Sequence, residues 1–272
     1  MIPIKSAEQV ELIRLSSLLV SETLAEVARS IRPGMTTLRL DKIADAFIHD
    51  HGGEPSFKGY RGFPNAICAS VNEAVVHGIP DERPIKEGDL VSIDCGIRLN
   101  GFHGDSAYTF GVGELADELR LLLEVTYECL WLGIRQAAAG NRVGDIGYAI
   151  QSHAEGEHGF GVVRQLVGHG IGQDLHESPE VPNFGRRGRG PKLREGMVVA
   201  IEPMINLGDR EVVTEKDGWT VVTVDSKPSA HYEHTVEVAK GSANVLSSFG
   251  MIEAAVAKNS SLQATGNLKL KA

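Results

Sequence analysis

The segment Val91–Phe110 constrains the fold of this chain most strongly, because it predicts a β-hairpin that carries acidic residues. The dipeptide Asn100-Gly101 separates two runs in which apolar and polar residues alternate. Such a dipeptide favours the type I′ turn, whose two central residues both have positive φ. The turn fixes the register: if Leu99 faces Phe102, every later pair follows to the ends of the segment.

Two carboxylates share one face of this predicted hairpin. Gly96 faces Asp105 in the register above, so Asp94 and Asp105 are diagonal neighbours with a backbone separation of roughly 7–8 Å. Asp is depleted in strands, and two carboxylates on one face repel each other, so a bound cation would offset the cost. The alternative is that this face is simply exposed to solvent, which is the commoner arrangement for an isolated pair.

Composition excludes several classes of protein. The 272 residues include 27 basic and 36 acidic side chains, and the net charge is −9, so there is no general attraction to DNA or to an anionic membrane. The three cysteines, Cys68, Cys95 and Cys129, lie far apart and form no Cys-x-x-Cys motif. They suggest neither a disulfide framework nor a thiolate zinc site, and they fit a reducing compartment.

Nothing in the sequence predicts a membrane segment. The first residues lack the unbroken apolar core of a signal peptide, and no apolar run is long enough to cross a bilayer. We therefore expect a cytoplasmic protein, and a monomer.

Helix and strand patterns divide the chain into comparable parts. Helices are predicted at about 6–31, 38–50, 115–139 and 143–154. A loop rich in aromatic residues and glycine, 55–64, precedes a strand at 65–77 that is interrupted by Asn72-Glu73. Beyond about 246 the pattern weakens, and 246–272 is expected to be a flexible or partly helical tail.

An internal repeat relates the two parts. Glu87–Asp94 matches Glu195–Glu202 with an offset of 108 residues, so that Asp94 corresponds to Glu202. A later strand, Tyr232–Ala239, carries Glu233 in the position that Asp105 holds in the first part. The sequence thus predicts one α+β catalytic domain, 1–245, made of two related halves at about 1–112 and 113–245.

Two candidate histidines lie in the sequence between the acidic pair of the first part and that of the second. His169 and His176 stand seven residues apart among glycines, a spacing unlike the His-Glu-x-x-His helix of zinc proteases. A lone histidine in such a loop is more often structural. Beside four carboxylates, however, one imidazole would complete a site suited to a pair of divalent first-row ions such as Mn, Fe or Co. The residues alone leave the choice between the two histidines open.

Five segments together resemble the type I methionine aminopeptidases over most of the chain, from the first helix to about Val245. They are GYRGFPNAICASVNEAVVHGIP, SIDCGIRLNGFHGDSAYTF, GHGIGQDLHESPEVPNFG, REGMVVAIEPMI and DGWTVVTVDSKPSAHYEHTVEV. The resemblance implies the pita-bread fold, a pseudo-twofold duplication with a curved antiparallel sheet flanked by helices. Prolidases share this fold.

The resemblance also implies a site with two divalent metal ions, which would be Co, Mn, Fe or Zn. Asp94 would bind one ion, Asp105 and Glu233 would bridge both, and His169 with Glu202 would hold the second. Glu202 would in addition act as general base.

The same resemblance implies residues that bind substrate. His77 and His176 would hydrogen-bond the scissile amide and the oxyanion that develops from it. A pocket for an unbranched apolar side chain would be lined by Phe57, Tyr60, Phe63, Cys68, Leu175, His176 and Trp219, although each of these could equally be ordinary core. Asn72 and Ser229 match positions that bind a monovalent cation in some members, and a role in a turn explains them equally well.

The function expected from the resemblance is removal of the initiator methionine from nascent proteins whose second residue is small. The short basic loop Arg186–Lys192 is a candidate contact for ribosomal RNA, although such loops are more often only solvated. The alternatives are another pita-bread hydrolase, such as a prolidase, and a binding protein on the same fold that has lost its metal ligands.

Overall fold

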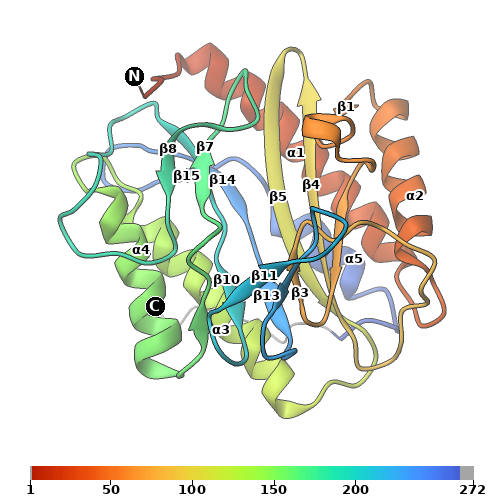
Figure 1. Ribbon diagram of the computed structural model, residues 1–272. Coiled ribbons are helices and arrows are strands. Elements are labelled where there is room, and N and C mark those ends of the chain that lie inside the picture. The colour runs from red at the N-terminus through yellow and green to blue at the C-terminus, as the bar shows by residue number, and fades with distance from the viewer. Residues whose placement is uncertain (1, 264–272) are drawn as a thin grey trace.

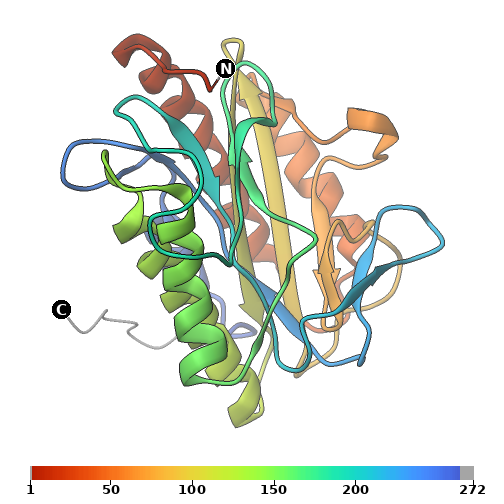
Figure 2. The same cartoon turned by 60° about the vertical axis from the view of Figure 1, so that its left-hand side comes forward.

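Curved antiparallel strands lie at the centre of the molecule, with helices packed against them (Figures 1 and 2). The computed structural model describes residues 2–263. Helices α1 (Ala7–Ser30) and α2 (Thr37–Asp50) cover the strands of the N-terminal part, whereas α3 (Asp117–Gln136) and α4 (Val143–Gln151) pack on later strands. Within these described residues, no helix is long and apolar enough to span a bilayer.

Within residues 2–263, the strands form four small antiparallel sheets. Their bounds are β1 Glu54–Pro55, β2 Cys68–Val71, β3 Ala74–Val76, β4 Leu90–Leu99, β5 Phe102–Gly111, β6 Gly161–Val162, β7 Gly168–Gly170, β8 Glu177–Val181, β9 Val198–Ile201, β10 Met204–Asn206, β11 Val212–Thr214, β12 Val221–Thr223, β13 Ser229–His231, β14 His234–Glu237 and β15 Asn244–Val245. The neighbour orders are β1-β4-β2 with β5 on β4, β13-β10-β6, β11-β12-β3, and β15-β14-β9-β7-β8.

The predicted hairpin is confirmed as β4 and β5. Leu99 pairs with Phe102 and Gly96 with Asp105, and the ladder runs without a bulge from Leu90 opposite Gly111 to the turn. Both turn residues have positive φ, 52° at Asn100 and 83° at Gly101. The turn chemistry therefore fixed the faces of both strands, as expected.

In the C-terminal part, β9 and β14 are antiparallel neighbours, with Ile201 opposite His234. Unlike β4 and β5, they are not joined by a tight turn, because β10 to β13 lie between them in sequence. Glu202 follows the last residue of β9, and Glu233 precedes the first residue of β14. The division into two related halves stays a prediction.

Several boundaries differ from the predicted ones. The strand expected at 65–77 is two strands, β2 and β3, because Asn72 between them has a φ of 53° and turns the chain. The helix expected at 115–139 is shorter, Asp117–Gln136. The helix expected at 143–154 ends as α-helix at Gln151 and continues as the π-helical turn η2, Ser152–Glu157. A 3-10 helix, η1 (Tyr60–Gly62), forms in the aromatic loop.

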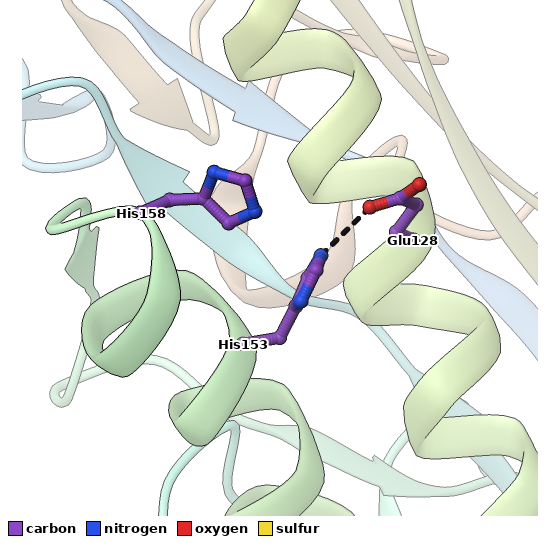
Figure 3. A group of neighbouring side chains, drawn as sticks. All are labelled: Glu128, His153 and His158. Atoms are coloured by element: carbon purple, nitrogen blue, oxygen red, sulfur yellow. Dashed lines mark hydrogen bonds and ion pairs between the residues drawn. The ribbon is translucent and has the colours of Figure 1, made fainter.

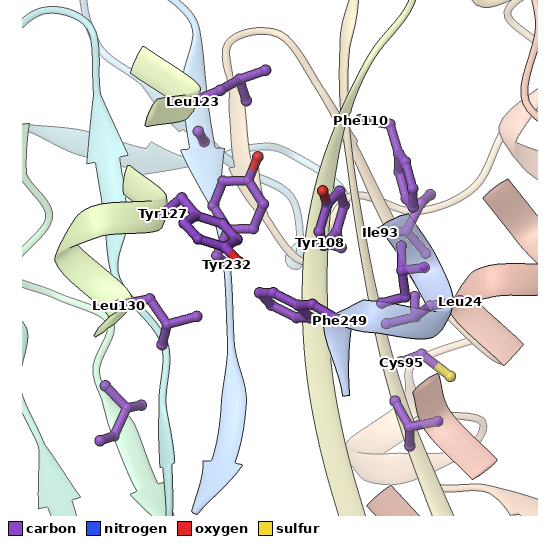
Figure 4. Packing of buried hydrophobic residues seen from close by; sticks show 14 of the residues in the cluster. Leu24, Ile93, Cys95, Tyr108, Phe110, Leu123, Tyr127, Leu130, Tyr232 and Phe249 are labelled. Carbon is purple, nitrogen blue, oxygen red and sulfur yellow. The ribbon is translucent and has the colours of Figure 1, made fainter. Parts of the chain in front are cut away.

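The segment after 246 is less exposed than a solvated tail would be. Helix α5 (Phe249–Val256) packs against α1, and Phe249 is only 4% exposed. Its ring lies 5.0 Å from that of Tyr108, which in turn lies 5.0 Å from Tyr232 (Figure 4). Burying one aromatic side chain contributes roughly 1.5–3 kcal/mol, so one well-placed Phe can anchor a short helix that composition alone makes look weak. The rest of the predicted tail, 264–272, lies outside the described residues.

Candidate metal centre

A cavity of about 490 Å³ opens between the two parts of the chain, and every predicted metal ligand lies at its wall. So does every residue predicted for the substrate pocket. The residues lining it include the five predicted ligands, Asp94, Asp105, His169, Glu202 and Glu233, and the eight predicted substrate contacts, Phe57, Tyr60, Phe63, Cys68, His77, Leu175, His176 and Trp219.

Strands position all five predicted ligands. Asp94 lies in β4, Asp105 in β5 and His169 in β7, whereas Glu202 directly follows β9 and Glu233 directly precedes β14. Rigid backbone holds such side chains more accurately than loops do.

Beside the site, hydrogen bonds join β5 to Glu233 and to Thr235 of β14. The Glu233 N–H donates to the Ala107 carbonyl at 2.9 Å, and the Ser106 hydroxyl donates to the Glu233 carbonyl at 2.6 Å. The Thr235 hydroxyl donates to the Asp105 carbonyl at 2.8 Å and accepts from the Asp105 N–H at 3.2 Å. The backbones that carry Asp105 and Glu233 are therefore tied directly to each other.

Three of the predicted ligands converge on one point. Asp105, His169 and Glu233 each offer an atom such that all three atoms lie within 4.8 Å of one another. His169 Nε2 is 3.6 Å from Glu202 Oε1 and 4.0 Å from Asp105 Oδ2. His169 Nδ1 is 2.9 Å from the Gly170 carbonyl, which can only accept, so Nδ1 carries the proton and Nε2 is left with its lone pair facing the carboxylates.

Buried oxygen atoms in this cluster lack hydrogen-bond partners among residues 2–263. These atoms are Asp94 Oδ1, Asp105 Oδ1 and Glu233 Oε1. Buried polar atoms are nearly always satisfied, so three unsatisfied acceptors on one cavity wall need an explanation. The donor set of oxygen atoms with one imidazole fits divalent first-row metal ions, which would satisfy these atoms.

Burial and mutual repulsion disfavour the charged forms of the carboxylates. Burial is the main cause that raises the pKa of Asp105, Glu202 and Glu233 well above the usual range, and neighbouring carboxylates add to it. Burial raises the pKa of Asp94 to about 7, although the hydrogen bond that it accepts from Asp105 works in the opposite direction. Without metal, the cluster is thus a set of acids that retain protons to neutral pH.

The histidines around the cavity are neutral for the same physical reason. Burial lowers the pKa of His169 to about 4, so its imidazole is in the form that binds metal. Burial, followed by the nearby His169, lowers the pKa of His176 to about 3. Burial also lowers the pKa of His77.

His176 and His77 lie beside the cluster. The His176 ring centroid is 4.3 Å from that of His169, and its Nδ1 is 2.8 Å from the Tyr60 hydroxyl. His77 has a φ of 58° and lies edge-on to Trp219, with ring centroids 6.4 Å apart. Both imidazoles therefore face the space next to the predicted ligands.

Apolar side chains line the adjoining part of the cavity. Phe63, Cys68 and Leu175 are buried, and the Phe63 ring packs edge-on against Trp219 with centroids 5.2 Å apart. Phe57 is packed against Gly96 of β4, where a Cβ atom would lie 2.6 Å from Phe57 Cε1. This wall suits an apolar side chain rather than a charged one.

The site also contains residues that the sequence did not indicate. His231 is 1% exposed, and its Nε2 lies 3.8 Å from Glu202 Oε2. Its position two residues before Glu233, on the same face of an extended segment, is the signal that could have identified it. Glu177 lines the cavity as well and forms an ion pair with Lys5 at 2.6 Å.

Asn72 and Ser229 are brought together, but away from this cavity. The Ser229 N–H donates to the Asn72 carbonyl at 2.9 Å. The Asn72 side chain donates to Asp89 and accepts from the Leu90 N–H, both at 2.9 Å. These contacts account for a turn, and a monovalent cation here stays a prediction.

The fold and the cavity together define a metal-dependent hydrolase with the pita-bread architecture. The chain belongs to metallopeptidase family M24, whose family model matches residues 11–240.

Named relatives are similar over nearly the whole chain. A methionine aminopeptidase of Clostridium perfringens is 52% identical over 246 residues, which is 90% of this chain and 98% of that protein. Methionine aminopeptidase 1 of Bacillus subtilis is 50% identical, with 90% and 99% covered.

Solved structures agree with this similarity. The crystal structure of methionine aminopeptidase from Rickettsia prowazekii superposes with a TM-score of 0.89 at 40% identity, covering 91% of this chain and 100% of that one. A prolidase from Pyrococcus furiosus has a TM-score of 0.75 at 22% identity and covers 90% of this chain and 65% of that one, which shows a shared fold only.

Proposed function

We propose that this chain removes the N-terminal methionine from newly made proteins whose second residue is small, by metal-dependent hydrolysis of the first peptide bond. One observation carries the proposal: carboxylates with unsatisfied buried oxygen atoms and a neutral histidine adjoin an apolar pocket in a single cavity. The similarity to methionine aminopeptidases supports the choice of substrate.

We assign the metal ligands as Asp94 for one ion, Asp105 and Glu233 as bridging residues, and His169 with Glu202 for the second ion. Co, Mn, Fe or Zn would each suit this donor set. When bound, divalent ions supply Lewis acidity and lower the pKa of water, which makes hydrolysis possible at neutral pH. The orphaned buried oxygen atoms on three of these carboxylates support the assignment.

The protein's own groups would orient the peptide and move protons. Glu202 would take the proton of the attacking water and pass it to the departing amine. His77 and His176 would hydrogen-bond the scissile amide and the oxyanion, respectively, and Tyr60 would hold His176 in orientation through the 2.8 Å hydrogen bond. The methionine side chain would enter the apolar wall formed by residues such as Phe63 and Leu175.

The proposal also covers the location of the enzyme, its oligomeric state and its further contacts. We propose that the enzyme acts in the cytoplasm as a monomer. Loop Arg186–Lys192 would contact ribosomal RNA near emerging chains, since it is basic and exposed over most of its length. A monovalent cation would stabilise the turn at Asn72 and Ser229.

The experiment begins with metal-free protein, obtained by chelation, to which Mn, Fe or Co is restored one at a time. Hydrolysis of Met-Ala-Ser and of Ala-Pro is then measured in parallel. The proposal expects methionine release from Met-Ala-Ser and little cleavage of Ala-Pro. Preferential cleavage of Ala-Pro would favour a prolidase instead, and no methionine release with any of the metals would reject the proposal.

A further inference from the structure

A second group of potential metal ligands lies outside the cavity, between α3 and η2. Glu128 of α3, His153 of η2 and His158 just after it each offer an atom within 4.8 Å of the other two (Figure 3). None of the three lines the cavity described above. All three side chains are partly exposed, so an ion could reach them from solvent.

The π-helical turn is what brings the two histidines together. His153 and His158 are five residues apart, a spacing that would separate them by about 140° around an α-helix. In a π-helix, hydrogen bonds join residues i and i+5, so side chains five apart lie one above the other. The two ring centroids are 4.8 Å apart at an interplanar angle of 75°. Such turns occur frequently at functional sites.

The hydrogen bonds of His153 match those of a metal-binding histidine. Its Nε2 lies 2.7 Å from Glu128 Oε2, and its Nδ1 lies 3.0 Å from Glu157 Oε2. Both carboxylates can only accept, so a neutral imidazole can satisfy one of them but not both. With a metal ion at Nε2, the Nδ1–H would still donate to Glu157, the carboxylate–histidine–metal arrangement that fixes a ligand's orientation.

The ion pair between His153 and Glu128 does not involve His158, so it does not explain the position of that side chain. Across residues 2–263, its ring nitrogens have no hydrogen-bond partner. Its ring stacks at 26° on Phe160, with centroids 6.1 Å apart, and Figure 3 shows it turned toward the gap between Glu128 and His153. The cluster therefore holds a partly exposed imidazole whose ring nitrogens contact no hydrogen-bonding protein group within residues 2–263.

We propose that Glu128, His153 and His158 bind a divalent transition-metal ion of the zinc type, which links α3 to η2. Two imidazoles and one carboxylate, with water as the fourth ligand, form a well-known tetrahedral donor set. Ligand atoms around such an ion lie about 3.3–3.5 Å apart, given bond lengths of about 2.0–2.2 Å. Side-chain rotations must open the 2.7 Å separation between His153 Nε2 and Glu128 Oε2 and close any separation as long as 4.8 Å, which are changes of about 0.5–1.5 Å.

The direct test counts bound metal. Chelator-stripped full-length protein is dialysed against buffered Zn²⁺, and zinc per chain is measured for wild type and His158→Ala. The proposal expects the variant to lose about one Zn²⁺ per chain relative to wild type, whatever the content of the main site. His49→Ala is the matched control, because His49 also lies near a carboxylate, Asp45 at 3.5 Å, but has no second imidazole in such a group. Equal zinc contents for all three proteins would overturn the proposal.

A second measurement needs no variant. Diethyl pyrocarbonate modifies accessible imidazoles, and the modified sites are located by mass spectrometry with and without Zn²⁺. Protection of His153 and His158, but not of His49, is expected. Equal modification of His158 under both conditions would overturn the proposal, even if His158→Ala failed to fold. Because these residues lie outside the cavity, methionine release by a folded Glu128→Gln variant should stay within about twofold of wild type.

Discussion

The Thr235 hydroxyl bridges the backbone of Asp105, donating to its carbonyl at 2.8 Å and accepting from its N–H at 3.2 Å. Four residues along β5, Thr109 makes the reciprocal contact with His231, donating to its carbonyl at 2.7 Å and accepting from its N–H at 2.9 Å. Two threonine hydroxyls thus replace part of a backbone ladder between β5 and the segment 231–235, which runs from the end of β13 into β14. This junction fixes the distance between the backbones that carry the predicted ligands Asp105 and Glu233.

Thr235→Val should therefore weaken both the fold and the metal site. The variant leaves the buried N–H and carbonyl of Asp105 without partners, which costs about 1–3 kcal/mol. Urea unfolding of the metal-free protein measures this loss, and titration with Mn²⁺ measures the metal affinity. Thr235→Ser, which retains the hydroxyl, should restore most of both.

Thr126→Val is the matched control for that substitution. Thr126 is equally buried, but its hydroxyl bonds only to the Leu122 carbonyl within α3. It should change metal affinity by less than about twofold. If Thr235→Val bound Mn²⁺ as well as Thr126→Val does, the junction would have no role in setting the metal site.

The pKa of Asp94 predicts a pH-dependent effect of Asp94→Asn in metal-free protein. Burial raises this pKa to about 7, against about 3.9 in an unfolded chain. Between these values, the folded state retains a proton that the unfolded chain has lost, so wild type loses stability as pH rises. Asn has no such proton, so the variant should gain stability relative to wild type by at least about 1.4 kcal/mol from about pH 5 to pH 8.

Unfolding free energies at several pH values test this sign. Saturating Mn²⁺ should reverse the order, making wild type the more stable protein, because the metal binds the charged carboxylate. A difference between the two proteins that does not change with pH would contradict the raised pKa.

Tyr60→Phe should impair catalysis through His176. Loss of the 2.8 Å hydrogen bond to Nδ1 frees the imidazole to rotate. A bond worth about 0.5–1.5 kcal/mol corresponds to a roughly 2–10-fold fall in kcat/KM for Met-Ala-Ser. Tyr148→Phe, which alters a tyrosine stacked on Arg187 outside the cavity, should leave kcat/KM unchanged. Equal rates for the two variants would exclude this role of Tyr60.

Gly96→Ala should narrow the substrate pocket. The added Cβ would lie 2.6 Å from Phe57 Cε1, so the ring must move from its present place in the cavity wall. We expect kcat/KM for Met-Ala-Ser to fall about tenfold, mainly through KM, with the bound metal content unchanged. An unaltered KM would show that Phe57 does not bound the methionine pocket.

The sequence predicted the placement of Asp94 and Asp105 well, because local chemistry determines it. Asn100-Gly101 specifies one turn type, which fixes the register of β4 and β5 and places Asp94 and Asp105 on one face. Side chains alternate between the two faces of each strand, so one correctly predicted turn gives the face of every side chain in the hairpin. The internal repeat, which aligns Asp94 with Glu202, extended the prediction of acidic site residues to the strands of the C-terminal part.

Features that depend on tertiary packing were harder to predict. Helix α5 is stabilised by Phe249 among aromatic side chains from distant segments, and no local pattern reports that contact. Helix α4 continues as the π-helical turn η2, and the periodicity of the sequence did not indicate this change. His231 lies in β13, which pairs with β10 so that His231 is opposite Met204, two residues after Glu202. Its place in the site therefore depends on a contact distant in sequence.

The most direct test of the metal centre is the rate of methionine release by Glu202→Gln, measured beside wild type at saturating Mn²⁺ with the bound metal determined for both. Gln keeps the shape of the side chain but cannot accept the proton of water. We predict a fall in kcat of at least about 100-fold, with urea unfolding still cooperative. Near-normal methionine release by this variant would contradict the role of Glu202 and the proposed centre with it.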